Sequence, residues 1–119
     1  MTIHRGDVVL VPFPFTDLSS KKVRPSLIIS SDPQQEDIVV LFISSVVPQH
    51  LPAFDFFLKS DHPNFSSTGL KVSSVFKTKK ILTVSYSQIL RHLGHLSVPL
   101  QTEIDKRLAN AVGLKLPAG

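Results

Sequence analysis

Cysteine is absent from this sequence of 119 residues. Its absence excludes disulfide bridges, zinc sites built on thiolates, and thiol nucleophiles, and it suits a reducing compartment. Long apolar runs are missing too, because stretches such as residues 38–43 fall far short of the roughly 20 residues that span a bilayer. The opening residues, MTIHRGD, lack the apolar stretch of a signal peptide. We therefore expect a soluble, cytoplasmic protein with no membrane contact.

Basic residues outnumber acidic ones, with 13 Lys and Arg against 9 Asp and Glu, for a net charge of +4. Such an excess favours an anionic partner, although a modest positive charge can serve solubility alone. The basic residues gather in two segments. The first contains Lys21, Lys22 and Arg24, and the second contains Lys71, Lys77, Lys79 and Lys80. Two such segments could flank one groove.

Short apolar runs interrupted by Pro, Ser and Asp are typical of a compact all-β barrel or sandwich. We expect strands at residues 8–13, 26–30, 38–45 and 54–58, and one or two strands within 71–84. Pro12 and Pro14 should close the first strand, because proline has no N–H to donate to a ladder. A polar loop over residues 16–23 should follow. The second and third runs should form a hairpin of strands buried on both faces.

One helix is expected near the end of the chain. Ser97 can cap it, Pro99 suits its first turn, and Gly113 can terminate it. Residues 86–93 suggest one or two further helical turns before Gly94. The length and the 42% hydrophobic content predict a single domain over residues 1–119.

Three blocks of the sequence resemble the MazF/PemK family of toxins. The first is Arg5-Gly6-Asp7, an apolar strand, a polar loop, and then Arg24-Pro25 before a second apolar strand. The second is residues 41–45, LFISS, with Leu51-Pro52 shortly after. The third is looser, running from Gly69-Leu70 to Thr83-Val84-Ser85, where Ser85 replaces the family's aspartate.

The resemblance implies a mainly β, SH3-like barrel of the CcdB/MazF/Kid type with a C-terminal α-helix. Proteins of this family form homodimers and are neutralised by a cognate antitoxin. They are sequence-specific endoribonucleases that cut single-stranded mRNA without a metal or other cofactor, leaving a 2′,3′-cyclic phosphate. The sequence likewise predicts no metal site, since no pair of histidines has convincing metal-ligand spacing.

Arg24 and Ser44 are the expected catalytic residues. A guanidinium can grip a phosphate through two parallel hydrogen bonds, and Pro25 biases Arg24 toward an extended backbone. Ser44 falls where many family members carry a threonine that works with the arginine, and its hydroxyl can donate to a phosphoryl oxygen. Alternatively, Ser44 only ends a strand or Ser45 takes this role.

The sequence departs from the family at the later strand. Kid-like members carry an Arg-x-Asp pair there, whereas this chain has Lys77 and Lys79 and so lacks the carboxylate. The general base is then Asp17, His50 or a neutral lysine. We expect the following residues to bind RNA: Lys21, Lys22, His50, Lys77 and Lys79.

Two other functions remain open on the sequence. CcdB toxins share the barrel but poison gyrase, through C-terminal residues that have no counterpart here. A catalytically impaired homologue that only binds RNA or the antitoxin would fit the missing carboxylate.

Overall fold

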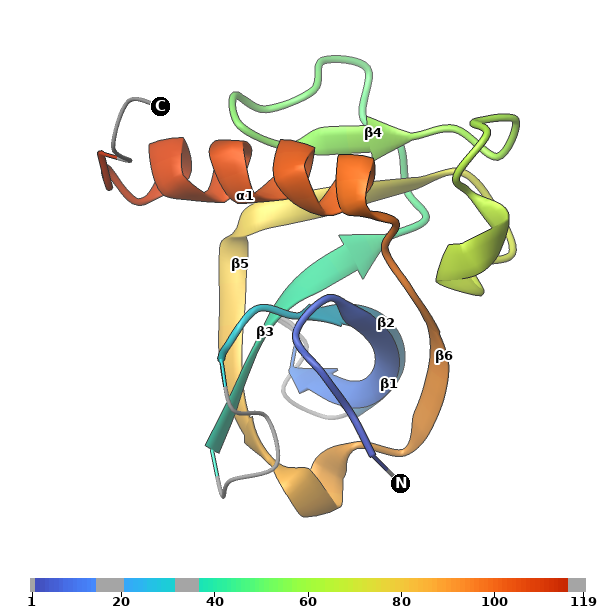
Figure 1. Ribbon diagram of the computed structural model, residues 1–119, viewed down its shortest axis with the longest axis vertical. Coiled ribbons are helices and arrows are strands. Elements are labelled where there is room, and N and C mark those ends of the chain that lie inside the picture. Colours follow the sequence, from blue (N-terminus) through green and yellow to red (C-terminus); the bar gives the residue numbers. More distant parts are fainter. Residues whose placement is uncertain (1, 15–20, 32–36, 116–119) are drawn as a thin grey trace.

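Six antiparallel strands form one curled sheet in the computed structural model, which describes residues 2–14, 21–31 and 37–115. The sheet follows the order β4-β5-β3-β2-β1-β6, and one helix lies across it (Figure 1). The prediction of a mainly β, SH3-like barrel with a C-terminal helix is confirmed. The elements in chain order are β1 (Asp7–Pro14), β2 (Lys21–Ile28), β3 (Asp37–Ser44), β4 (Phe56–Leu58), η1 (Ser66–Thr68), β5 (Ser74–Ser85), η2 (Tyr86–Gln88), β6 (Arg91–His95) and α1 (Val98–Ala111).

The β1–β2 hairpin is longer than the sequence predicts. Residues 21–23, expected in the loop, begin β2 and pair with residues 12–14, so β1 continues through both of its prolines. Proline is tolerated there because β6 pairs with β1 only as far as Leu10, and beyond it the described part of β1 has a neighbour on one side only. The hairpin therefore carries Arg24 within a paired strand.

Strand β3 is buried on both faces, as predicted from its continuous apolar run. Ile38, Val40 and Phe42 belong to one buried cluster, while Leu41 and Ile43 belong to another. The period of two along a strand sends successive side chains to opposite faces, so two apolar layers sandwich this strand. Its pairing with β2 confirms the expected hairpin.

The ladder between β3 and β5 is interrupted next to Phe42. Phe42 pairs with Lys77, whereas the preceding residue, Leu41, pairs with Ile81. Residues 78–80 are thus inserted into β5 without partners on β3, and β5 bends sharply between its two arms (Figure 1). Extra residues in one strand of a pair produce such a kink and redirect the side chains around it.

The helical turns expected at residues 86–93 are largely wrong. A short 3₁₀ helix occupies residues 86–88, but Arg91 starts a strand, β6, that pairs with β1. The sequence RHLGH has weak strand propensity and contains a glycine, so pairing with β1 decides its conformation.

Helix α1 agrees with its predicted boundaries. The Ser97 hydroxyl accepts a hydrogen bond from the Leu100 N–H, and Gly113 follows the helix with a φ of +73°. Leu100 and Ile104 pack into the second buried cluster, beside Leu41 and other sheet residues. No helix in the described part of the chain is long and apolar enough to cross a membrane.

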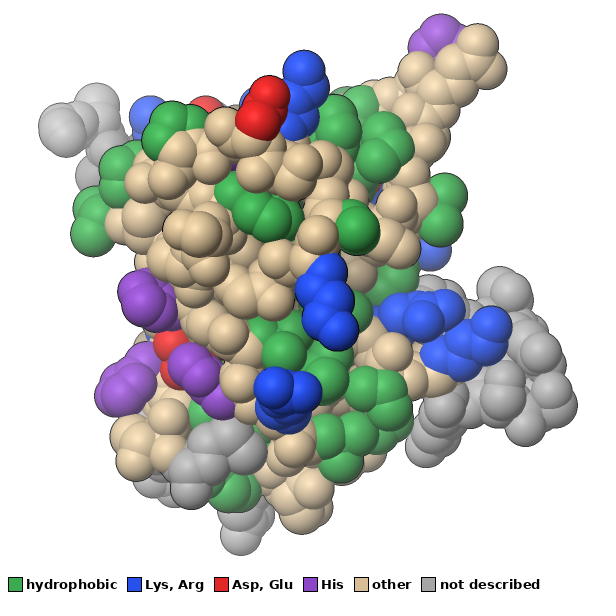
Figure 2. Space-filling view, turned by 90° about the vertical axis from the view of Figure 1, so that its right-hand side faces the viewer, with side chains coloured by type: hydrophobic (Ala, Val, Ile, Leu, Met, Phe, Trp, Pro, Cys, Tyr) green, Lys and Arg blue, Asp and Glu red, His purple; other side chains and the backbone are tan. Residues whose placement is uncertain are grey.

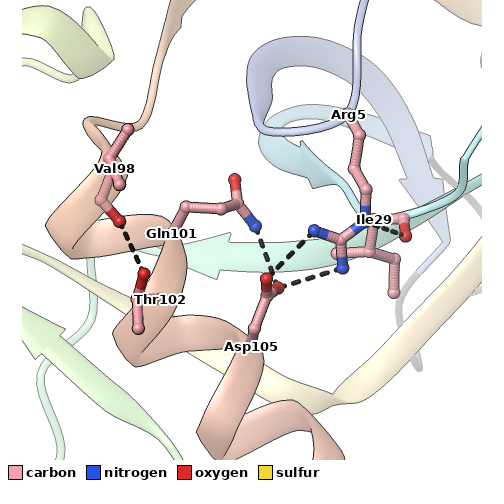
Figure 3. A network of polar contacts seen from close by, with 6 residues as sticks. All are labelled: Arg5, Ile29, Val98, Gln101, Thr102 and Asp105. Carbon is pink, nitrogen blue, oxygen red and sulfur yellow. Dashed lines mark hydrogen bonds and ion pairs between the residues drawn. The ribbon is translucent and has the colours of Figure 1, made fainter. Parts of the chain in front are cut away.

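Arg5 ties the start of the chain to α1 (Figure 3). Its two terminal nitrogens donate to the Asp105 carboxylate at 3.0 and 3.2 Å, and its Nε donates to the Ile29 carbonyl at 2.9 Å. Gln101 donates to the same carboxylate. The planar fork of arginine suits this bidentate geometry, so the contact orients the helix on the sheet.

Gly94 lies where the β6 backbone meets η1. A Cβ on Gly94 would lie 2.2 Å from the Ser67 carbonyl oxygen and 2.5 Å from the carbonyl carbon of Thr68. Both are backbone atoms, which cannot rotate away as a side chain can. Only glycine therefore permits this close approach of β6 to η1.

We predict that Gly94→Ala lowers the free energy of unfolding by about 2–3 kcal/mol, because β6 must move away from η1. Gly113→Ala is the control, since its Cβ would meet nothing within 4 Å and only its positive φ carries a cost, about 1 kcal/mol. Urea unfolding followed by circular dichroism measures both. Equal losses in the two variants would contradict the steric explanation.

Candidate functional site

Arg24 lies in β2, opposite Val11 of β1, and its side chain is half-buried. The next residue, Pro25, is paired with Leu10, which on its other side is paired with Arg91 of β6. Arg24, Pro25, Leu10 and Arg91 all line the same groove. The paired strands therefore hold the Arg24 backbone in place, as expected from the Arg-Pro sequence.

Ser44 ends β3 and is largely buried, opposite Val75 of β5. Its hydroxyl oxygen accepts a hydrogen bond from the Val46 N–H at 3.1 Å. Because a hydroxyl also carries a donor, Ser44 can still give its hydrogen to an oxygen in the groove. Ser45, the alternative, lines the groove as well and is exposed.

Lys77 and Lys79 have different surroundings. Lys77 is half-buried and lines the groove, with its Nζ 3.5 Å from the Asp55 carboxylate. Lys79 is exposed, does not line the groove, and has its Nζ 5.5 Å from the centre of the Phe54 ring. The next residue, Lys80, lines the groove.

These residues share a groove of about 890 Å³. Its described lining holds six cationic side chains and no carboxylate: Lys22, Arg24, Lys71, Lys77, Lys80 and Arg91. Figure 2 shows Lys and Arg side chains beside exposed hydrophobic ones on the central part of the face, with no Asp or Glu between them. Several phosphate-sized anions could bind there through charge-assisted hydrogen bonds.

The other site residues predicted from the sequence either do not line the groove or lie outside the residues that the structure describes. Lys21 begins β2, where it pairs with Pro14. His50 is exposed in the segment after β3 and does not line the groove. Asp17, one candidate for the general base, lies outside the described residues.

Histidines gather elsewhere, around Asp7. His4 Nδ1 lies 4.0 Å and His92 Nε2 3.3 Å from the Asp7 Oδ2 atom, which also accepts a hydrogen bond from the His4 N–H. Across residues 2–14, 21–31 and 37–115, no group of three His, Asp or Glu side chains is arranged to hold a metal ion.

The site residues predicted from the sequence did not include four residues in or next to the groove. Lys71 and Lys80 belonged to a recognised basic segment, which was the available signal, and the interruption of β5 brings Lys80 into the groove. Arg91 was hidden in a segment expected to be helical. The sequence contains no signal for Asp55, because its ion pair with Lys77 joins positions 22 residues apart.

Solved structures similar to this one include bacterial toxins and an endoribonuclease. A protein described as an endoribonuclease from mycobacterial species has a TM-score of 0.70 and 19% identity, over 98% of this chain and 97% of that one. Toxin MazF-mt6 of Mycobacterium tuberculosis has a TM-score of 0.71 and 18% identity, over 92% and 99%. MazF of Deinococcus radiodurans has a TM-score of 0.71 and 16% identity, over 96% and 99%. At these identities the likeness shows the fold.

The sequence itself identifies the family. No curated protein is significantly similar in sequence to this chain. Residues 4–112, however, match the family described as PemK-like, MazF-like toxin of type II toxin-antitoxin system. The match includes the Arg5-Gly6-Asp7 and Arg24-Pro25 blocks and every described residue that lines the groove. The chain therefore belongs to the PemK-like, MazF-like toxin family of type II toxin–antitoxin systems.

Proposed function

We propose that this protein is a sequence-specific, metal-independent endoribonuclease that cuts single-stranded mRNA to a 2′,3′-cyclic phosphate. The observation that carries the proposal is one groove in which Arg24 and Ser44 meet four lysines and a second arginine, with no carboxylate in its described lining. A cationic groove attracts a polyanion, and the paired strands that line it hold Arg24 and Ser44 in place. The similarity to a mycobacterial protein described as an endoribonuclease supports the same activity.

The reaction needs no atom from outside the RNA. The 2′-hydroxyl oxygen bonds to the adjacent phosphorus while the bond from phosphorus to the 5′-oxygen breaks. The 2′-hydroxyl proton passes to a base, and the leaving 5′-oxygen takes up a proton. Arg24 and Lys77 stabilise the charge that develops on the phosphoryl oxygens, and Ser44 donates one hydrogen bond to them. Asp17, His50 and a lysine are the candidates for the base.

The protein's partners follow from its family and from the groove. We propose a homodimer of single-domain chains, residues 1–119, that acts in the cytoplasm. Its inhibitor is a cognate antitoxin whose acidic segment occupies the cationic groove in place of RNA. A mycobacterial neighbour, described as an endoribonuclease in complex with its cognate antitoxin, supports an antitoxin as partner; its TM-score is 0.70 at 18% identity, over 98% of this chain and 100% of that one.

We predict that Arg24→Ala lowers the rate of RNA cleavage by about 100- to 1,000-fold, the usual effect of removing a donor to a developing oxyanion. Purified protein is incubated with a long RNA in EDTA, and the new ends are mapped by sequencing. Lys106→Ala, an exposed lysine on α1 outside the groove, is the control and should cut as the unchanged protein does.

Cleavage that survives Arg24→Ala, or that disappears in EDTA, would contradict the mechanism. RNA binding without cleavage at every pH between about 5 and 9 would favour an impaired homologue. Trapped DNA–gyrase complexes without RNA cutting would favour a gyrase poison.

A second prediction separates two adjacent hydroxyls. Ser44→Ala should slow cleavage by about 10- to 100-fold, the equivalent of one hydrogen bond to a charged group. Ser45→Ala should change the rate by less than about threefold, a bound of roughly 0.7 kcal/mol. Single-turnover cleavage of one mapped site measures both variants, and the reverse order would assign the role to Ser45.

A further inference from the structure

A buried carboxylate lies behind the groove. Asp55 precedes β4 and is only 4% exposed, yet it does not line the groove itself. Its Oδ2 atom lies 3.5 Å from the Nζ of Lys77, which does line the groove. An ion pair so close to a binding surface controls where the lysine ammonium lies, because a lone lysine has a long and flexible side chain.

Hydrogen bonds hold the carboxylate, the N–H and the carbonyl of Asp55. Its Oδ1 accepts a hydrogen bond from the Thr78 N–H at 3.2 Å, and its own N–H donates to the Pro52 carbonyl at 3.1 Å. Its carbonyl accepts a hydrogen bond from Arg107 of α1 at 2.6 Å, and that guanidinium also lies over the Phe56 ring. The backbone of Asp55 is therefore tied to α1, while its carboxylate is tied to Thr78 and Lys77 of β5.

The interruption of β5 explains why this carboxylate is needed. Thr78 is the first of the three inserted residues, so its N–H has no partner on β3. Asp55 Oδ1 takes that donor, while the Thr78 hydroxyl donates to the Phe54 carbonyl at 3.1 Å. One carboxylate thus satisfies the buried N–H with one oxygen and contacts the Lys77 ammonium with the other.

We propose that Asp55 is a positioning residue for the RNA cleavage assigned above, and this inference rests on that proposed function. Asp55 holds the Lys77 ammonium at the floor of the groove, so that its remaining N–H groups donate to the phosphoryl oxygens beside Arg24. Lys77 thereby acts as a fixed cation, although a lysine lacks the planar fork of arginine.

A purely structural role for Asp55 would be to accept the Thr78 N–H and nothing more. Asp55→Asn separates the two roles, because the amide oxygen can still accept from Thr78 while the charge facing Lys77 is lost. The test compares Asp55→Asn, Lys77→Met and the double variant by their kcat and KM on a mapped RNA site. Asp61→Asn, an exposed aspartate, is the matched control.

Asp55→Asn should lower kcat by about 10- to 100-fold, the cost of a misplaced catalytic group, with KM changed by less than about threefold. In the Lys77→Met background the same change should have less than about a twofold effect, because the partner that Asp55 positions is already gone. Asp61→Asn should behave as the unchanged protein does.

Three results would overturn the proposal. The first is a normal kcat for Asp55→Asn. The second is a fold-loss of kcat in the double variant equal to the product of the two single fold-losses. The third is a loss of kcat in Asp55→Asn that is explained by a lower Tm. Should Asp55→Asn fail to fold, Lys77→Met decides alone, since it leaves the bond from Thr78 to Asp55 in place. Because Lys77→Met leaves the buried Asp55 carboxylate without its counter-ion, the Tm of this variant falls as well. Its kcat is therefore measured well below that Tm, and a normal kcat would overturn the proposal.

A measurement independent of cleavage keeps this proposal separate from the proposed function. Side-chain NMR of the lysines follows a titration with inorganic phosphate. Lys77 should shift more than any other groove lysine in the unchanged protein, and at most about half as far in Asp55→Asn, because an unanchored ammonium spends less time at the floor. Equal shifts in both would overturn the role of Asp55, whereas intact RNA with unequal shifts would overturn only the proposed function.

Discussion

The interruption between β3 and β5 is the constraint on which the groove depends. Because Phe42 pairs with Lys77 while Leu41 pairs with Ile81, β5 gains three residues and bends at this point. The bend leaves Lys77 and Lys80 in the groove and Lys79 over Phe54. It also frees the Thr78 N–H, which the Asp55 carboxylate accepts. An irregularity that would weaken an ordinary sheet here arranges the charged side chains of the site.

The family signature near the N-terminus combines a part that holds the fold together and a part that lines the groove. Arg5 binds Asp105 of α1, and Asp7 closes the preceding turn by accepting the His4 N–H, so this block orients the helix and the first strand. Arg24 lies in the next strand and lines the groove. A match to the whole signature therefore reports the fold as much as the chemistry.

The groove is lined by positive charge, and the carboxylate that pairs with one of its lysines lies behind the lining. Six cations of the described residues line the groove, and the carboxylate of Asp55 lies beneath one of them without reaching the lining. A groove with this net charge favours a polyanion over a distance. The ion pair with Asp55 also restrains one flexible cation, which the proposed cleavage needs in order to stabilise a developing charge.

The sequence alone determined the features that depend on short-range chemistry. Three such features follow from neighbouring residues. They are the ends of α1 at Ser97 and Gly113, the burial of β3 on both faces, and the extended backbone of Arg24 before Pro25. Only the tertiary structure decided β6, the inclusion of Arg91 and Lys80 in the groove, and the Asp55–Lys77 pair. Those features depend on strand register between residues far apart in the chain, and local propensity carries no information about which residues a register brings together.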